Sequence, residues 1–178
     1  MRCPEIEACF ENLGPADYDR NRVSPPTVDY NCIAYAVGET DKRWWPSIRW
    51  KGDYYWPPHL PREKPLEETL ENFVRAFETK RYRVCKTAKP KKGIEKVAIY
   101  AGPAGNPLHA ARQLESGMWT SKCGDLEDIE HKTIASMEGK HYGKVAIFLE
   151  RKRNGKTFLT DRVSEAFAKF CRVVRRAF

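Results

Sequence analysis

The sequence predicts an α+β fold in which N-terminal helices pack on an antiparallel sheet of about four or more strands. Two helical patterns come first: residues 30–37, followed by Gly38, and a run from Pro65 with apolar residues at helical spacing. The second half changes to strand-like segments, namely EKVAIYAG, LHAARQL, MWTSKCG and YGKVAIFLERK. The short connection ESG at 115–117 favours antiparallel neighbours, whereas 125–142 predicts a helical turn plus a loop.

Length and composition indicate one domain of ordinary size. The chain has 178 residues, of which 41% are apolar, enough for a hydrophobic core. We expect one main domain over 1–152 and a basic amphipathic helix over 153–178 packed on it. No apolar run reaches the roughly 18 residues of a membrane span. The acidic N-terminal stretch differs from a signal peptide, so we expect a cytoplasmic protein.

The positive charge is concentrated near the C-terminus. Residues 151–178 contain nine Lys or Arg and two acids, so +7 of the net +8 lies there. Such a helix predicts salt-dependent docking of a nucleic acid or an acidic partner. The alternative is a helix that packs its apolar side on the domain and leaves the basic side in solvent.

The stretch VDYNCIAYAVGET raises the question of whether Cys32 is a core residue or a nucleophile. We expect Asp29 to cap the helix, which would place Cys32 at its third position. A thiol at a helix N-terminus is a good nucleophile when a histidine lies nearby, and His109 begins a predicted strand. The histidine would act first as base and then as acid. The alternative is a buried cysteine and a structural histidine.

The six cysteines show no C-x-x-C pair and no regular spacing. Zinc sites usually show close ligand pairs, so we expect neither a metal nor another cofactor. The chain length and the absence of an export signal also argue against a disulfide framework. Free thiols are therefore expected.

An aromatic segment at 41–61 holds four of the five tryptophans and four of the twelve prolines. We predict an ordered loop that either covers the core or forms one wall of a binding groove. The candidate substrate-binding residues are Tyr30, Trp44, Trp45, Tyr55, Trp56 and Trp119.

Several motifs together resemble an uncharacterised family of small bacterial proteins. The stretches are YNCIAYAVGETDKRWWP, EKVAIYAG, HAARQLESGMWTSKCG, DIEH and YGKVAIFL, and the resemblance covers about residues 10–150. The order of a helix led by cysteine and a strand led by histidine also resembles the papain-like fold of NlpC-type cysteine peptidases and amidases. This resemblance implies that Cys32 is the nucleophile and His109 the base of a hydrolase acting on a protein or peptide.

The residue that orients His109 has several candidates. Ser121, on the strand after the histidine, matches the position that the resemblance implies. Gln113 alternates onto the same strand face as His109, while Asp128 and His131 follow in the predicted loop.

An oxyanion hole would use the backbone N–H of Cys32, assisted by Asn31 or Tyr30. Asn31 is equally well explained as a cap or turn residue. If no proper third residue exists, the alternative function is a catalytically silent binding module on the same scaffold.

Overall fold

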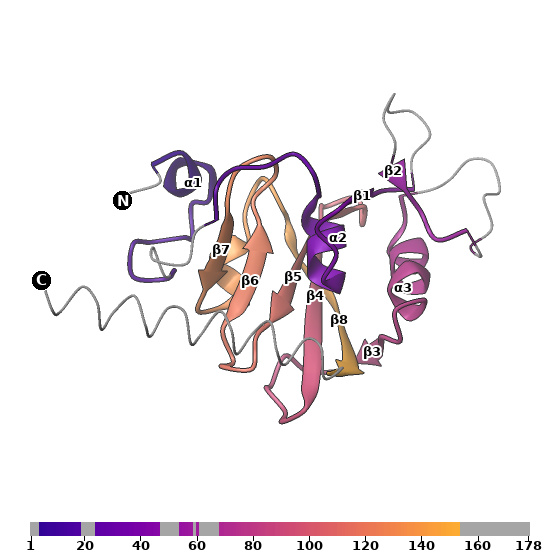
Figure 1. Ribbon diagram of the computed structural model, residues 1–178. Helices are drawn as coiled ribbons and strands as arrows, with labels where there is room; N and C mark the ends of the chain where they lie inside the picture. Colours follow the sequence, from indigo (N-terminus) through magenta and orange to yellow (C-terminus); the bar gives the residue numbers. More distant parts are fainter. Residues whose placement is uncertain (1–3, 19–23, 47–53, 59, 61–67, 154–178) are drawn as a thin grey trace, which may run out of the picture.

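The computed structural model describes residues 4–18, 24–46, 54–58, 60 and 68–153 (Figure 1). The predicted C-terminal helix lies outside the described residues from position 154 onward. No helix in the described ranges combines the length and the apolar character that a membrane crossing requires.

A six-stranded antiparallel sheet forms the centre of the molecule, with strand order β3-β8-β4-β5-β6-β7 (Figure 1). The four predicted strand segments correspond to β4, β5, β6 and β8, and β3 and β7 extend the sheet at its two edges. The bounds are β3 (Arg83–Cys85), β4 (Ile94–Ala101), β5 (Pro107–Gln113), β6 (Trp119–Lys122), β7 (Asp128–His131) and β8 (Lys144–Lys152). The molecule is therefore of the α+β class with an antiparallel sheet.

The described helices are few and short. They are α1 (Pro4–Cys9), α2 (Cys32–Val37), α3 (Leu70–Glu78) and a single 3-10 turn (Ile134–Met137). Two further strands, β1 (Arg43–Trp44) and β2 (Tyr54–Tyr55), pair in parallel within the aromatic segment.

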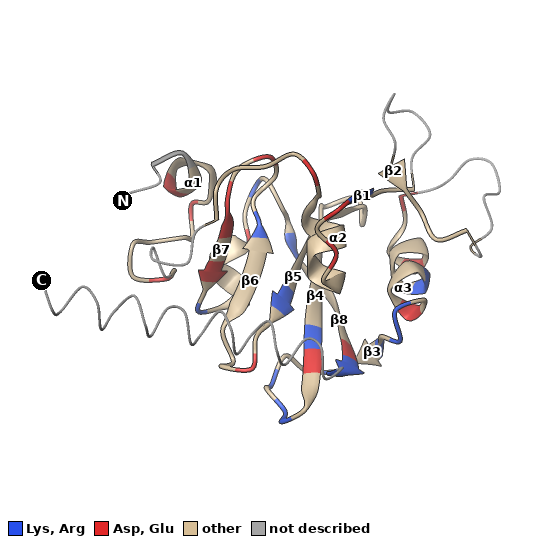
Figure 2. Cartoon of the chain, in the orientation of Figure 1, with Lys and Arg blue, Asp and Glu red and all other residues tan. Residues whose placement is uncertain are grey.

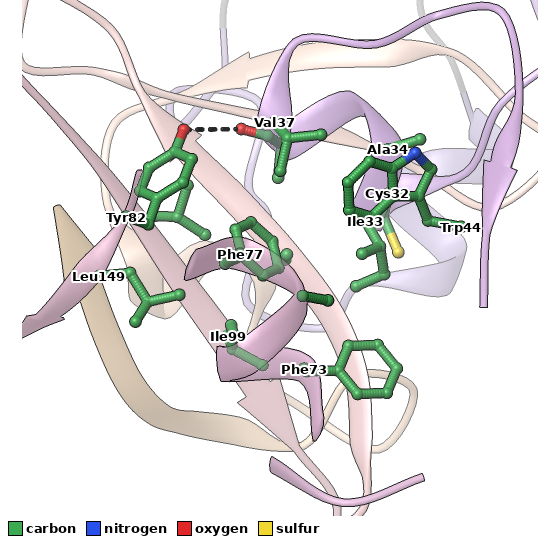
Figure 3. Packing of buried hydrophobic residues seen from close by; sticks show 14 of the residues in the cluster. Cys32, Ile33, Ala34, Val37, Trp44, Phe73, Phe77, Tyr82, Ile99 and Leu149 are labelled. Carbon is green, nitrogen blue, oxygen red and sulfur yellow. Dashed lines mark hydrogen bonds between the residues drawn. The ribbon is translucent and has the colours of Figure 1, made fainter. Parts of the chain in front are cut away.

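Both faces of the sheet are covered. On one face, which we call the α2 face, α2 and α3 pack against the side chains of Val97, Ile99, Ala110 and Leu149. Figure 3 shows part of this cluster, including the hydroxyl of Tyr82, which donates to the carbonyl of Ala36. On the opposite face, Tyr100, Ala111, Trp119 and Ile129 pack against residues of α1 and the 3-10 turn. Alternation along each strand sends neighbouring residues to opposite clusters.

The ends of α2 are set by two local features. Asn31, rather than Asp29, is the N-cap, because its side chain accepts from the amide of Ala34 and the first helical residue is Cys32. Gly38 ends the helix in the left-handed conformation at φ 88°, as the sequence predicts. Cys32 is therefore at the first helical position and not at the third.

Two other predictions about secondary structure need correction. The described part of α3 begins at Leu70, with Thr69 as its N-cap, and not at Pro65. Residues 128–131 form β7 instead of a loop, because their side chains alternate between the two faces of the sheet, whereas the helical turn predicted within 125–142 is present as the 3-10 turn Ile134–Met137.

A buried ionic cluster joins α2 and α3 to the sheet. The carboxylate of Glu95 is fully buried and accepts from the hydroxyl of Tyr82 at 2.5 Å and from the guanidinium of Arg151 at 2.8 Å. Arg112 and Arg153 lie 3.5 Å from its other oxygen. Arg151 also donates to the carbonyl of Val37 in the last turn of α2, where a cation is favourable. We call these residues the Glu95 cluster.

Candidate functional site

Cys32 is held in place by Asn31 and the aromatic segment. The side chain of Asn31 caps α2, and the same side chain donates to the carbonyl of Trp44 and accepts from its amide, at 2.8 and 3.1 Å. In Figure 3, Trp44 lies with Cys32 and Ile33 at one end of the α2-face cluster. Asn31 therefore caps α2 and also links the helix to the backbone of Trp44 in the aromatic segment. These hydrogen bonds fix the position of the neighbouring Cys32 thiol.

The thiol of Cys32 lies where β5 and β6 separate. The two strands pair at Arg112 with Thr120 and at Gln113 with Trp119, and nowhere else along their described lengths. Burial raises the pKa of the Cys32 thiol to about 11, whereas nearby backbone N–H groups, first that of Ala110, favour the thiolate and act against it. The thiol thus lies beside the backbone amide of Ala110, in the part of β5 that does not pair with β6.

His109 lies on the opposite face of the sheet from α2. It is the neighbour of Ala110, whose side chain belongs to the α2 face, and its ring contacts Tyr100 and stacks on Tyr142. The stacked rings are 3.9 Å apart between centroids and inclined by only 3°. Burial raises the pKa of Tyr142, and the thiols of Cys123 and Cys32 raise it further. Tyr142 thus covers the ring of His109 on this face of the sheet.

His109, Ser121 and His131 form one chain of hydrogen bonds. The Oγ of Ser121 lies 3.0 Å from Nε2 of His109 and 2.9 Å from Nε2 of His131. Nδ1 of His131 lies 2.7 Å from the backbone carbonyl of Thr133. All three side chains are fully buried, so β5, β6 and β7 each contribute one buried polar group to the same chain.

The carbonyl of Thr133 fixes the direction of this chain. A carbonyl can only accept, so Nδ1 of His131 carries a proton. In neutral His131, Nε2 then accepts from the hydroxyl of Ser121, whose oxygen in turn accepts from Nε2–H of His109. Neutral His109 is left with an unprotonated Nδ1. The network thus assigns the tautomers of both rings.

Both histidines are held in the neutral form. Burial lowers the pKa of His131 to about 4. Burial also lowers the pKa of His109 well below its usual value, and the adjacent His131 adds to this effect. The directed chain described above therefore holds at neutral pH.

Nδ1 of His109 is buried and has no hydrogen-bond partner among the described residues. Buried nitrogens without a partner are rare and call for an explanation. Cys32 makes no hydrogen bond to this atom, although its thiol lies beside the amide of the next residue, Ala110. The arrangement offers an unprotonated base and a neutral thiol on the two sides of one strand.

The other candidates for orienting His109 lie elsewhere. Gln113 donates to the carbonyl of Ala88 at 3.0 Å and supports the loop before β4. Asp128 points to the α2 face, where it accepts from the hydroxyl of Tyr30 at 2.5 Å. Of the predicted candidates, the structure therefore brings only Ser121 and His131 to His109.

The predicted substrate-binding aromatics are mostly internal. Trp44 and Trp56 belong to the α2-face core and are 0% and 4% exposed, while Trp119 packs on the opposite face. Trp45 and Tyr55 are partly exposed, but Trp45 packs edge-on against Phe73. Trp44 and Trp56 thus fit the alternative in which the aromatic segment covers the core.

Sequence reasoning missed Tyr142 and Thr133. Thr133 acts through its backbone, which leaves no side-chain signal. For Tyr142 the signal is the following glycine: Gly143 has φ 73°, and a Cβ there would lie 1.9 Å from the carbonyl oxygen of Ala101. The backbone can turn Tyr142 over His109 only with glycine at this position. Within the described residues, no group of three or more His, Cys, Asp or Glu is arranged to hold a metal ion.

A family model for a domain of unknown function, DUF7689, matches residues 21–150. The chain belongs to this family. The matched range contains Cys32, His109, Ser121, His131 and Tyr142, so the whole candidate site lies inside the DUF7689 domain. No curated protein and no solved structure matches the chain.

Proposed function

We propose that this DUF7689 protein is a papain-like, NlpC-type thiol hydrolase that cleaves an amide, isopeptide or related acyl bond in a protein or peptide. The observation that supports this proposal most directly is the unprotonated, unpartnered Nδ1 of buried His109. A base of this kind and a thiol at the start of a helix are the two groups that thiol hydrolases need, and here they lie on the two sides of β5. The helix that begins at Cys32 and packs on β5, the strand of His109, supports the papain-like assignment.

Each residue of the site has a role in the proposed reaction. In this reaction, Nδ1 of His109 would accept the proton of the Cys32 thiol as sulfur attacks the carbonyl carbon of the substrate, which requires the two groups, now on the two sides of β5, to come together. Backbone N–H groups beside the thiol, those of Ala110 and Ile33, stabilise the developing oxyanion. His109 then gives its proton to the leaving amine, and water hydrolyses the resulting thioester. Ser121 and His131 hold the imidazole in the tautomer that keeps Nδ1 available.

The raised pKa of the thiol shapes this mechanism. At neutral pH, Cys32 and His109 are both uncharged, because burial raises the pKa of the first to about 11 and lowers that of the second. Proton transfer must therefore accompany attack on the substrate, unlike in enzymes with a preformed thiolate. Access to the buried pair requires the Tyr142 ring to move off His109.

A thiol-labelling experiment tests the proposal. The native protein is incubated with a peptidyl vinyl sulfone, which captures nucleophilic thiols, and the adduct is located by intact mass and peptide mapping. We expect modification at Cys32, loss of labelling in Cys32→Ser, and at least a tenfold slower reaction in His109→Ala. His141→Ala is the matched control, because His141 is an exposed histidine beside Tyr142.

Two results would contradict the hydrolase. One is a thiol that reacts only when the protein unfolds, and the other is labelling of Cys32 at the same rate in His109→Ala and in the native protein. Equal labelling of Cys9, which is partly exposed, would show general thiol reactivity instead of a site. The His141→Ala variant should match the native rate in either case.

The burial of Cys32 and His109 favours a second candidate, a catalytically silent papain-like binding module. Cys32 is 9% exposed and His109 is fully buried, and no hydrogen bond joins them. In this case the basic C-terminal segment would dock an acidic protein or a nucleic acid. Because the four described cysteines are free, we infer a reducing compartment such as the cytoplasm for either function.

A further inference from the structure

A second basic region lies outside the candidate site, in the segment that contains β3 and leads to β4. Residues 80–92 contain seven Lys or Arg and no acid. Lys86, Lys89, Lys91 and Lys92 are exposed and make no ion pair with any described residue. By contrast, Lys80 pairs with Glu39 at the edge of this region. Most of this charge is therefore presented to solvent.

The fold brings the end of β8 to the same place. Lys152 is the register partner of Ile94, and the amide of Arg153 donates to the carbonyl of Gly93 at 2.9 Å. The basic segment 80–92 and the described end of β8, where Lys152 is exposed, thus meet at one end of the sheet. Figure 2 shows Lys and Arg at this end of β5 and β8 and in the neighbouring loop, together with acids on β4 and β8. We call this region the basic end.

Buried side chains hold the backbone of the basic end in a fixed path. Gln113 on β5 donates to the carbonyl of Ala88 at 3.0 Å, and the ammonium of Lys96 donates to that of Thr87 at 2.8 Å. Both anchoring residues are nearly fully buried, at 3% and 2% exposure. The lysines that flank Thr87 and Ala88 therefore project from a pre-positioned loop, which lowers the entropy lost when they bind a ligand.

We propose that the basic end binds the phosphate backbone of duplex nucleic acid without reading its sequence. Lysine is depleted from protein–protein interfaces, which are instead enriched in aromatic anchors, so a lysine-rich surface fits phosphates better than it fits a protein. The only large apolar side chain exposed here is Val84, among the described residues. Without exposed aromatic rings to stack bases, the basic end suits a duplex rather than a single strand.

Fluorescence anisotropy tests this proposal with the full-length protein. The probes are labelled DNA and RNA duplexes of one arbitrary sequence, about 20 base pairs long, at salt concentrations from about 50 to 200 mM. We expect the double variant Lys89→Glu/Lys91→Glu to lower the affinity at least tenfold at the lowest salt. The slope of log affinity against log salt should flatten by about 2, since each lost phosphate contact removes about 0.9. Lys132→Glu/Lys140→Glu is the matched control, with two exposed lysines elsewhere and the same change in net charge.

Each outcome decides the proposal. A loss confined to the basic-end variant supports it, and the duplex that binds more tightly, DNA or RNA, names the source of the phosphates. An equal loss of duplex affinity in both variants would mean that only the net charge of the protein matters, and it would overturn the proposal. Unchanged affinity in the basic-end variant would move binding to another segment and also overturn it. Binding of an acidic polypeptide or an anionic vesicle, with no duplex binding, would identify a different partner.

Discussion

Two buried polar clusters in this protein differ in whether all of their acceptor atoms receive a hydrogen bond. In the Glu95 cluster, both carboxylate oxygens accept from neighbouring donors, and Arg151 extends the cluster to the carbonyls of Val37 and Lys80. In the chain from Thr133 to His109, every link is made until the last atom, Nδ1 of His109. A network that is satisfied at every oxygen holds elements together, whereas one that ends in an open acceptor has a place for a proton.

The charges of the two clusters differ as well. The Glu95 cluster is ionic and fastens α2 and α3 to the sheet. The His109 chain is neutral, since burial lowers the pKa of both histidines. Changes in the first should therefore affect stability most, and changes in the second should depend on pH.

The largest effect is expected from Glu95→Gln. Three guanidinium groups would lose the carboxylate that compensates them, and removing one partner of a buried ionic group costs about 3–5 kcal/mol. Urea unfolding of the native protein and the variant measures the difference. Glu71→Gln removes the exposed pair with Arg75 and is the control, with an expected change below about 0.5 kcal/mol. Similar values for the two variants would contradict the structural role of the cluster.

A smaller, pH-dependent effect is expected from His131. Its pKa falls from 6.5 in the unfolded chain to about 4 in the folded protein. Below pH 6.5 the unfolded state binds a proton that the folded state does not, so stability falls as the pH falls towards about 4. This difference corresponds to roughly 3 kcal/mol.

Urea unfolding at several pH values separates this effect from other acid effects. In His131→Gln the loss of stability between pH 6.5 and about 4 should be smaller than in the native protein. The pairs of Glu39 and Glu150, which lower the pKa of these carboxyls, weaken in acid in both proteins and cancel in the comparison. Parallel pH profiles would mean that His131 is not held neutral.

The sheet was largely predictable because its central strands are apolar and long enough to show their period. EKVAIYAG and YGKVAIFLERK correspond closely to β4 and β8. The short strand β7 was missed, because the segment 125–142 was predicted to be a helical turn plus a loop. In fact the alternation D-I-E-H sends Ile129 and His131 to one face and the two acids to the other.

The candidate site was predictable only in part. A motif resemblance indicated Cys32, His109 and Ser121, but no property of a sequence gives the direction of a hydrogen-bond chain, which here depends on the backbone carbonyl of Thr133. The tryptophans of the aromatic segment left two predictions open, a cover over the core or a wall of a binding groove, because composition cannot distinguish a buried ring from an exposed one. Trp44 and Trp56 are core residues, as the first of these predicts.

The central claim is that buried His109 presents an unprotonated Nδ1 at neutral pH. The most direct measurement is the tautomer and protonation state of His109 from long-range ¹H–¹⁵N NMR correlations between about pH 5 and 8, with the signal assigned by His109→Gln. We predict a neutral ring with the proton on Nε2 throughout this range, because burial lowers the pKa of His109 well below its usual value. A proton on Nδ1, or a second proton on the ring within this range, would contradict the account.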